Sequence, residues 1–135
     1  MTALDQLHHW VASGTARAYL RDPACHPVRT PGYSFRPYLR LWLDIPPRAV
    51  SFDKADFAPN GRLLLLPTPA AAYERTMLRS LGERSRAAIT ARPDFRRDYR
   101  LVAASARWEL YADAACRAGH AAPAGAVATR VAIRR

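Results

Sequence analysis

The sequence lacks the short motifs that mark the common enzyme classes. It has no glycine-rich phosphate-binding loop, no dinucleotide-binding fingerprint, no nucleophile elbow and no paired-carboxylate signature. Only six of its 135 residues are glycine. The longest apolar runs, such as residues 63–66, are far shorter than the roughly 18 to 20 residues of a membrane-spanning helix. We therefore expect a protein without a membrane span, and we assign it no catalytic residue and no cofactor.

Cysteine is equally scarce. Two residues, Cys25 and Cys116, are too few for a disulfide scaffold, so reduced thiols are expected. The first twenty residues carry Asp5, His8 and Arg17, which a secretory signal peptide would not. A cytoplasmic location is therefore expected. Apolar residues make up 50% of the chain, enough for a core without disulfides or a structural metal.

Lysine is almost absent, yet the chain is strongly basic. Lys54 is the only lysine among 21 basic residues, and 11 acidic residues leave a net charge of +10. A GC-rich genome explains the choice of arginine over lysine, but it does not explain the excess of base over acid. Such an excess attracts polyanions: nucleic acid, acidic proteins or anionic lipid. A solvated basic surface with no dedicated partner is the alternative.

Hydrophobic periodicity predicts the elements of the first half of the chain. Apolar residues at helical spacing indicate a helix over residues 3–21, and closely spaced prolines indicate a loop over 22–37. Residues 38–45 alternate apolar and polar side chains, which predicts a strand that ends at a proline pair. Short strands are expected over 50–53 and 62–66. The second of these is apolar on both faces and should be central.

The second half of the chain is predicted to be mainly helical. A helix is expected over 68–91 and another over 94–117, although residues 99–111 also fit an extended conformation. Residues 127–133 alternate as a strand does. The predicted fold class is a single α+β domain spanning 1–135, with a small, mainly antiparallel sheet of three to four strands covered by two to three helices.

The first candidate binding surface follows from the expected strand over 38–45. Tyr38, Arg40 and Trp42 would share the face opposite the leucines. Aromatic rings stack on bases and arginine contacts phosphates, so this face would suit single-stranded nucleic acid. The alternative is a second buried layer, in which the rings pack beneath the proline-rich loop.

The second candidate surface is an arginine-rich stretch. Residues 75–100 hold eight arginines against Glu83, Asp94 and Asp98, a net charge of +5. Like charges four residues apart on a helix cost a few tenths of a kcal/mol, so they do not stabilise an isolated helix. Such a face suits phosphates or an acidic partner, and a solvated helix surface is the alternative. The candidate binding residues here are Arg75, Arg79, Arg86, Arg96, Arg97 and Arg100.

Cysteine and histidine could also form a metal site. Cys25, His26, Cys116 and His120 are a potential zinc-ligand set. Adjacent residues rarely both reach one metal ion, and no repeated Cys-x-x-Cys element is present, so we assign no metal.

Three classes of function remain open. The first is a non-catalytic module that binds nucleic acid. The second is a small interaction, inhibitor or accessory protein, encoded for example by a mobile element, that docks on a larger acidic or nucleic-acid-binding partner or on a second copy of itself. The third is a small ribonuclease or toxin-like enzyme, which requires a histidine and arginines in one cleft. Its only candidate acid-base residues are His8, His9, His26, His120 and Lys54.

Overall fold

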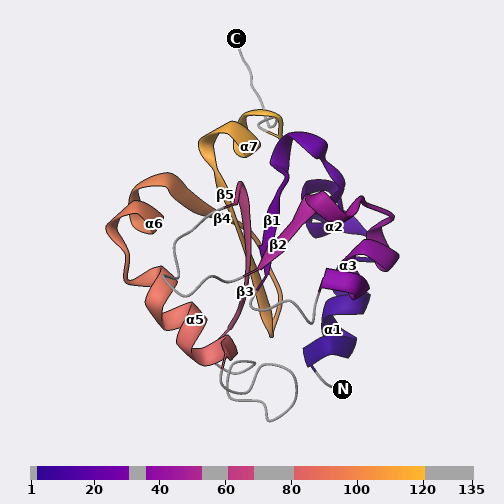
Figure 1. The fold of residues 1–135 in the computed structure, drawn as a ribbon, viewed down its shortest axis with the longest axis horizontal. Helices are drawn as coiled ribbons and strands as arrows, with labels where there is room; N and C mark the ends of the chain where they lie inside the picture. The colour runs from indigo at the N-terminus through magenta and orange to yellow at the C-terminus, as the bar shows by residue number, and fades with distance from the viewer. Residues whose placement is uncertain (1–2, 31–35, 53–60, 69–80, 121–135) are drawn as a thin grey trace.

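The computed structural model describes residues 3–30, 36–52, 61–68 and 81–120. Within these residues a mixed β-sheet lies between two groups of helices (Figure 1). The elements in chain order are α1 (Ala3–Trp10), α2 (Gly14–Arg21), η1 (Pro23–Cys25), β1 (Val28–Thr30), α3 (Arg36–Leu43), η3 (Pro47–Ala49), β2 (Val50–Phe52), β3 (Leu63–Pro67), α5 (Leu81–Thr90), α6 (Pro93–Asp98), β4 (Tyr99–Ala104), β5 (Trp108–Asp113) and α7 (Ala114–Ala118).

The sheet has five strands in the order β2-β1-β3-β5-β4. β1 runs parallel to both β2 and β3, whereas β5 is antiparallel to both β3 and β4. The predicted α+β class is confirmed. The sheet is larger and more evenly mixed than the mainly antiparallel sheet of three to four strands that the sequence suggested.

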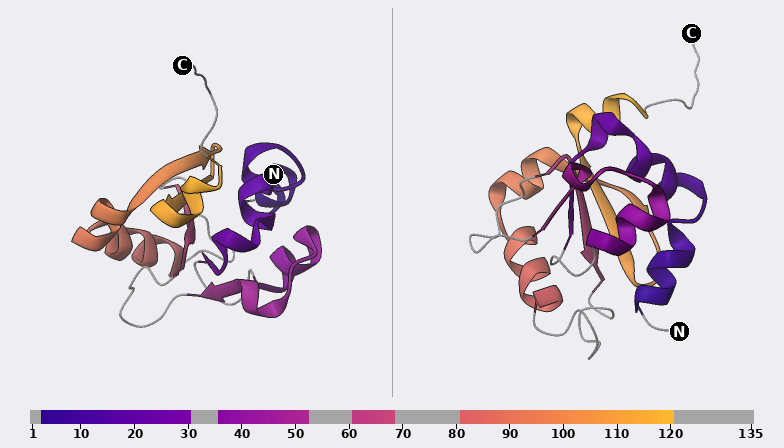
Figure 2. Two further views of the ribbon diagram at one scale, coloured as in Figure 1. Left: turned by 90° about the horizontal axis from the view of Figure 1, so that it is seen from above. Right: turned by 45° about the vertical axis from the view of Figure 1, so that its right-hand side comes forward.

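The central strand β3 separates two hydrophobic clusters. Leu63 and Leu65 pack with side chains of α1, α2, α3 and α7, and Leu64 and Leu66 pack with Ile89 of α5 and aromatic rings on the opposite face. All four leucines are at most 1% exposed. Both views in Figure 2 keep α5 and α6 on one side of the sheet and α1 to α3 on the other. The predicted central strand over 62–66 and the predicted short strand over 50–53 are thus confirmed, within one residue at each end, and the second of these lies at an edge of the sheet.

The N-terminal helix is divided. A continuous helix over 3–21 was expected, but α1 ends at Trp10 and α2 begins at Gly14. Gly14 has a φ of 77°, a left-handed conformation that glycine adopts without strain and that interrupts a right-handed helix. The break lets Leu7 and Leu20, both fully buried, reach the same core from two separate helices.

The predicted strand over 38–45 is wrong, because these residues form most of helix α3. Adjacent parallel strands need a crossover connection, and α3 is the crossover between β1 and β2. The helix buries Leu39 and Leu43, four residues apart, and leaves Leu41 78% exposed. The expected loop over 22–37 likewise contains β1 and the start of α3.

The predicted helix over 94–117 is also wrong for most of its length. It is replaced by the short helix α6, the hairpin β4–β5 and the short helix α7. The alternative of an extended chain over 99–111 is confirmed. In β5, Trp108, Leu110 and Ala112 are buried and alternate with half-buried residues, the period of a strand. The described part of the predicted helix over 68–91 is α5, and the predicted strand over 127–133 lies outside the described residues.

Candidate anion-binding cleft

A cleft of about 470 Å³ opens between the end of α2 and the segment that follows α3. Arg21, His26 and Arg48 provide its basic lining, and Asp44 is the one carboxylate among the described residues that line it. Prolines and Ala49 form the rest of the wall together with Ile45. The volume is in the range of sites that hold small ligands, so it can accommodate a phosphate group with the unit attached to it.

Local backbone structure fixes each polar group of the cleft. Arg21 is the last residue of α2, and His26 follows η1 with its Nε2 2.8 Å from the carbonyl oxygen of Leu20. That nitrogen therefore donates to the backbone and does not face a ligand. Arg48 lies in η3, which the guanidinium of Arg36 ties to the start of α3 through a 3.1 Å bond to the carbonyl oxygen of Pro47.

Asp44 ends helix α3 in a left-handed backbone conformation that residues other than glycine seldom adopt. Its φ is 53°, and the amide of Ile45 donates to the carbonyl oxygen of Arg40 at 3.3 Å. This is the helix-ending arrangement in which glycine usually occupies the left-handed position, and aspartate is among the few residues that tolerate it. The turn directs the chain from α3 into η3 and so brings Arg48 to the cleft.

The charge of the cleft is open to solvent. Arg21 and Arg48 are both exposed, and within the described part of the chain neither contacts a carboxylate. A shallower groove adjoins the cleft and shares Asp44 and Ile45 with it. Arg40 lines that groove, exposed and likewise without an ion pair to any described residue. Three arginines therefore line two adjoining hollows, and Asp44 is the one carboxylate that the described residues contribute to them.

The expected aromatic and arginine platform does not exist as predicted. Because residues 36–43 are helical, Tyr38 and Trp42 lie on one flank of α3 and Arg40 lies on the other. The ring centroids of Tyr38 and Trp42 are 5.5 Å apart. Trp42 is half-buried against the core, and His8 stacks on it at 4.2 Å with the rings 6° from parallel. Of the two rings, Tyr38 is the more exposed, at 38%.

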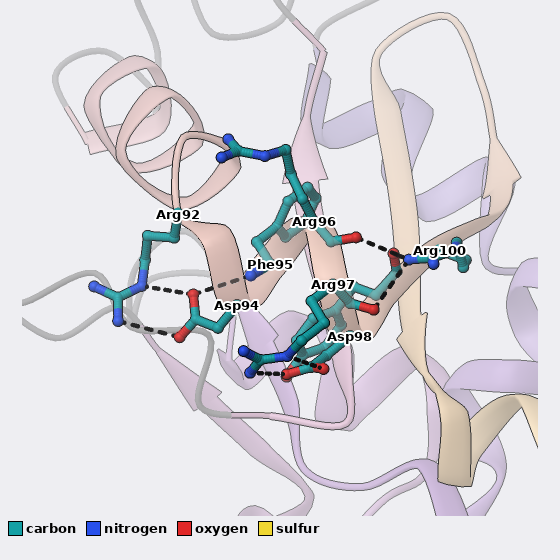
Figure 3. Close-up of polar contacts among 8 residues, drawn as sticks. Arg92, Asp94, Phe95, Arg96, Arg97, Asp98 and Arg100 are labelled. Carbon is teal, nitrogen blue, oxygen red and sulfur yellow. Dashed lines mark hydrogen bonds and ion pairs between the residues drawn. The ribbon is translucent and has the colours of Figure 1, made fainter.

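Two arginines of the arginine-rich stretch form ion pairs with aspartates of the same stretch. Arg92 forms a two-bond ion pair with Asp94, and Arg97 forms one with Asp98 (Figure 3). Hydrogen bonds from these guanidinium groups are the main cause that lowers the pKa of each carboxyl below its usual value. Arg100 donates to the carbonyl oxygens of residues 96, 97 and 99. Its charge therefore stays close to the α6 backbone.

The other predicted residues of this stretch are spread over several places. Arg86 of α5 forms an ion pair with Glu109 of β5 and donates to the carbonyl oxygen of Pro67 at 2.9 Å. Arg96 is exposed and donates to the carbonyl oxygen of Ala91 at 3.0 Å. Arg75 and Arg79 lie outside the described residues.

Sequence reasoning missed Arg21 and Arg48, and it considered His26 only as a metal ligand or as a general base. Arg48 is far along the chain from Arg21 and His26, Arg21 ends the predicted helix over 3–21, and His26 and Arg48 each adjoin a proline. They meet because the α3 crossover returns the chain beside the end of α2. The proline-rich composition around both segments was the only signal, since prolines often mark long functional connections.

The cysteines are not reduced thiols as expected, since Cys25 and Cys116 form a disulfide. Among the potential zinc ligands, Cys25 and His120 lie close together with Asp22, and Cys116 is bonded to Cys25. His26 is not part of this group. Disulfides persist mainly in oxidising compartments, so this bond weighs against the expected cytoplasmic location. None of the described helices is long and apolar enough to cross a membrane.

Comparison of the chain with protein-family models, curated proteins and solved structures gave no match in any of the three. No relative therefore supplies a function for the cleft.

Proposed function

We propose that this chain is a non-catalytic binding module for polyanions, with nucleic acid as the principal candidate, and that the basic cleft is its binding surface. One observation carries the proposal. Arg21, Arg40 and Arg48 line two adjoining hollows to which the described residues contribute one carboxylate, and all three arginines are exposed without ion pairs to described residues.

Guanidinium groups suit phosphates because their planar N–H donors match the phosphate oxygens in pairs. Arginines without an internal carboxylate partner lose no existing ion pair when they bind a phosphate. This distinguishes the cleft from α6, where Arg97 would first have to leave Asp98. A nucleic-acid strand that binds Arg40 and crosses α3 would also reach Tyr38 on the opposite flank of the helix. A base could stack on the ring of Tyr38 there.

A protein partner is the second candidate. Leu41 is 78% exposed and lines the same groove as Arg40. An exposed leucine beside an arginine is a combination that protein interfaces use. An acidic protein segment would then occupy the hollow in place of a phosphate backbone.

A ribonuclease has weaker support. His26 alone among the four histidines lines the cleft. His8 stacks on Trp42, and His120 pairs with Asp22. General acid-base cleavage needs two groups that exchange protons with the substrate. Among the described residues that line the cleft, Asp44 is the only other titratable candidate besides the arginines.

The test is fluorescence anisotropy of labelled single- and double-stranded oligonucleotides at about 50 and 200 mM salt, where several phosphate contacts should cost orders of magnitude in affinity. The double variant Arg21→Gln/Arg48→Gln should bind at least tenfold more weakly and should lower the slope of log affinity against log salt by roughly two. The matched control is Arg96→Gln/Arg97→Gln, which removes the same charge from α6.

The outcomes separate the candidates. A loss confined to the cleft variant supports the proposal. A loss confined to the α6 variant would move the site to the arginine-rich stretch and overturn the assignment of the cleft. If wild-type protein binds no oligonucleotide at the lower salt but binds an acidic peptide such as polyglutamate, the protein-partner reading replaces nucleic acid. Cleavage of labelled RNA that Arg21→Gln/Arg48→Gln abolishes would instead favour the enzyme.

A further inference from the structure

A second cluster of reactive side chains lies apart from the cleft lining, where α2 and η1 meet α7. The ring Nε2 of His120 is 2.7 Å from Oδ2 of Asp22, and the same oxygen is 3.9 Å from Sγ of Cys25. The ligand atoms of Asp22, Cys25 and His120 all lie within 4.8 Å of one another. Cys116 completes the group through its bond to Cys25. Three potential metal-ligand atoms thus lie close together, and the sulfur of Cys116 is bonded to one of them.

The local backbone holds these groups in place. The carboxylate of Asp22 caps η1 by accepting from the amide of Ala24 at 2.9 Å, and Asp113 caps α7 by accepting from the amide of Cys116 at 2.9 Å. Both caps lie within three residues of a cysteine. The ring of Tyr19 stacks on His120 at 3.9 Å. The cluster is therefore assembled by two capped turns and an aromatic contact as well as by the disulfide.

The donor set matches zinc. Two thiolates, one imidazole nitrogen and one carboxylate oxygen give four ligands of the kinds that Zn²⁺ binds in tetrahedral protein sites. The Cα atoms of Cys25 and Cys116 are 4.6 Å apart. Two thiolates on one zinc ion, each at about 2.3 Å from it, lie roughly 3.8 Å from each other. In the zinc-bound state the two cysteine side chains would rotate so that their sulfurs, bonded to each other in the oxidised chain, move apart to that distance.

We propose that reduction of the Cys25–Cys116 disulfide creates a zinc site formed by Cys25, Cys116, His120 and Asp22. A dithiol reductant supplies two electrons and two protons, which break the S–S bond and leave two thiols, while the reductant becomes a cyclic disulfide. Each thiol then loses its proton to solvent as its sulfur binds Zn²⁺. His120 binds through Nε2 and Asp22 through a carboxylate oxygen, so the hydrogen bond between them is replaced by bonds to the metal.

The disulfide and the zinc ion would perform the same structural task in two redox states. Each would join η1 to α7 and hold α7 against the core. This inference does not depend on the proposed function, because His26 and the arginines of the cleft take no part in it.

The experiment uses the full chain, reduced with dithiothreitol and desalted without oxygen, and then titrated with Zn²⁺ or Co²⁺. We expect one metal ion per chain, and for Co²⁺ an absorption spectrum with sulfur-to-cobalt charge-transfer bands. Oxidised protein should bind none, because disulfide sulfurs are poor ligands. His120→Ala and Asp22→Asn should each weaken binding tenfold or more. His9→Ala, which removes an exposed histidine of α1, is the matched control and should bind as wild type does.

Circular dichroism records the fold in each sample. If reduction unfolds the chain, Zn²⁺ should restore the helical signal, and failure to restore it would overturn the proposal. A reduced chain that stays metal-free at micromolar Zn²⁺ would do the same. Equal weakening of metal binding by His120→Ala and His9→Ala would also overturn the proposal, because the metal would then be bound at another place. The charge-transfer bands report thiolate ligands even where a variant folds poorly, and their absence would also count against the site.

Discussion

Cys25 and Cys116 are 91 residues apart in the sequence, and their Cα atoms lie 4.6 Å apart in a disulfide that joins η1 to α7. Both cysteines are fully buried in the larger of the two hydrophobic clusters. The bond therefore connects the first part of the chain to the last described helix through the core, and its removal should affect the stability of the whole domain.

Removal of the disulfide should lower the free energy of unfolding by about 4 kcal/mol in Cys25→Ala/Cys116→Ala, because a cross-link across so long a loop strongly restricts the unfolded chain. Urea denaturation of the variant and of oxidised wild type measures the difference. Wild type reduced in the absence of metal is the control and should resemble the variant. A difference below about 1 kcal/mol would contradict a disulfide in the folded protein.

Two leucines of α3 distinguish a helix from the strand that the sequence suggested. Leu39→Ala should cost about 2 to 5 kcal/mol, since Leu39 is fully buried. Leu41→Ala should change stability by less than about 0.5 kcal/mol, since Leu41 is mostly exposed. A strand would place both side chains on one face and make the two losses similar. Thermal or urea unfolding of the two variants decides between them.

Arg86 should act on stability rather than on binding. It pairs with Glu109, which also accepts from the hydroxyl of Tyr111 at 3.1 Å, and all three side chains are partly buried. Arg86→Gln should cost roughly 1 to 3 kcal/mol, because it leaves the carboxylate without its main partner. The exposed Arg96→Gln is the control and should be within about 0.5 kcal/mol of wild type. A weaker oligonucleotide affinity in Arg86→Gln at unchanged stability would contradict this assignment.

Stability should fall at high pH through Tyr99. Burial, with smaller contributions from nearby carboxylates, raises the pKa of Tyr99 to about 12 from its ordinary value of 10.0. Below pH 10 the phenol is protonated in both the folded and unfolded states, so its contribution is complete. As the pH rises from about 10 to about 12, the unfolded state ionises first, and stability should fall by on the order of 2 kcal/mol.

The measurement for Tyr99 is urea denaturation at pH 8 and pH 11. Tyr99→Phe should be less stable at pH 8, because it loses the hydrogen bond to the carbonyl oxygen of Gly61. It should also lose less stability on going to pH 11. Part of the fall should persist, since burial also raises the pKa of Tyr111. A variant whose stability falls as steeply as that of wild type would contradict the burial of an un-ionised phenol.

The candidate site was only partly predictable. Net charge indicated a polyanion partner, and Arg40 was identified as a binding residue from a strand that does not exist. Hydrophobic periodicity could not identify Arg21 and Arg48 as cleft residues, because they come together only where α3 returns the chain beside α2. Conversely, Arg97 stood out through the local charge of its stretch. The sequence could not show that Arg97 forms an ion pair with the neighbouring Asp98.

The sequence by itself determined the α+β class, the central position of strand β3 and the presence of a short strand at β2. Local composition is decisive for these, since a short run of leucines buried on both faces suits only the middle of a covered sheet. Tertiary structure alone decided that residues 36–43 are helical, and it decided between the helix and the extended chain that the sequence allowed over 99–111. Leucine and aromatic residues fit either a helix or a strand. Residues 36–43 are helical because the parallel strands β1 and β2 require a crossover, and residues 99–113 are extended because they pair with each other and with β3. The disulfide had the same origin, since only the packed fold brings Cys25 to Cys116.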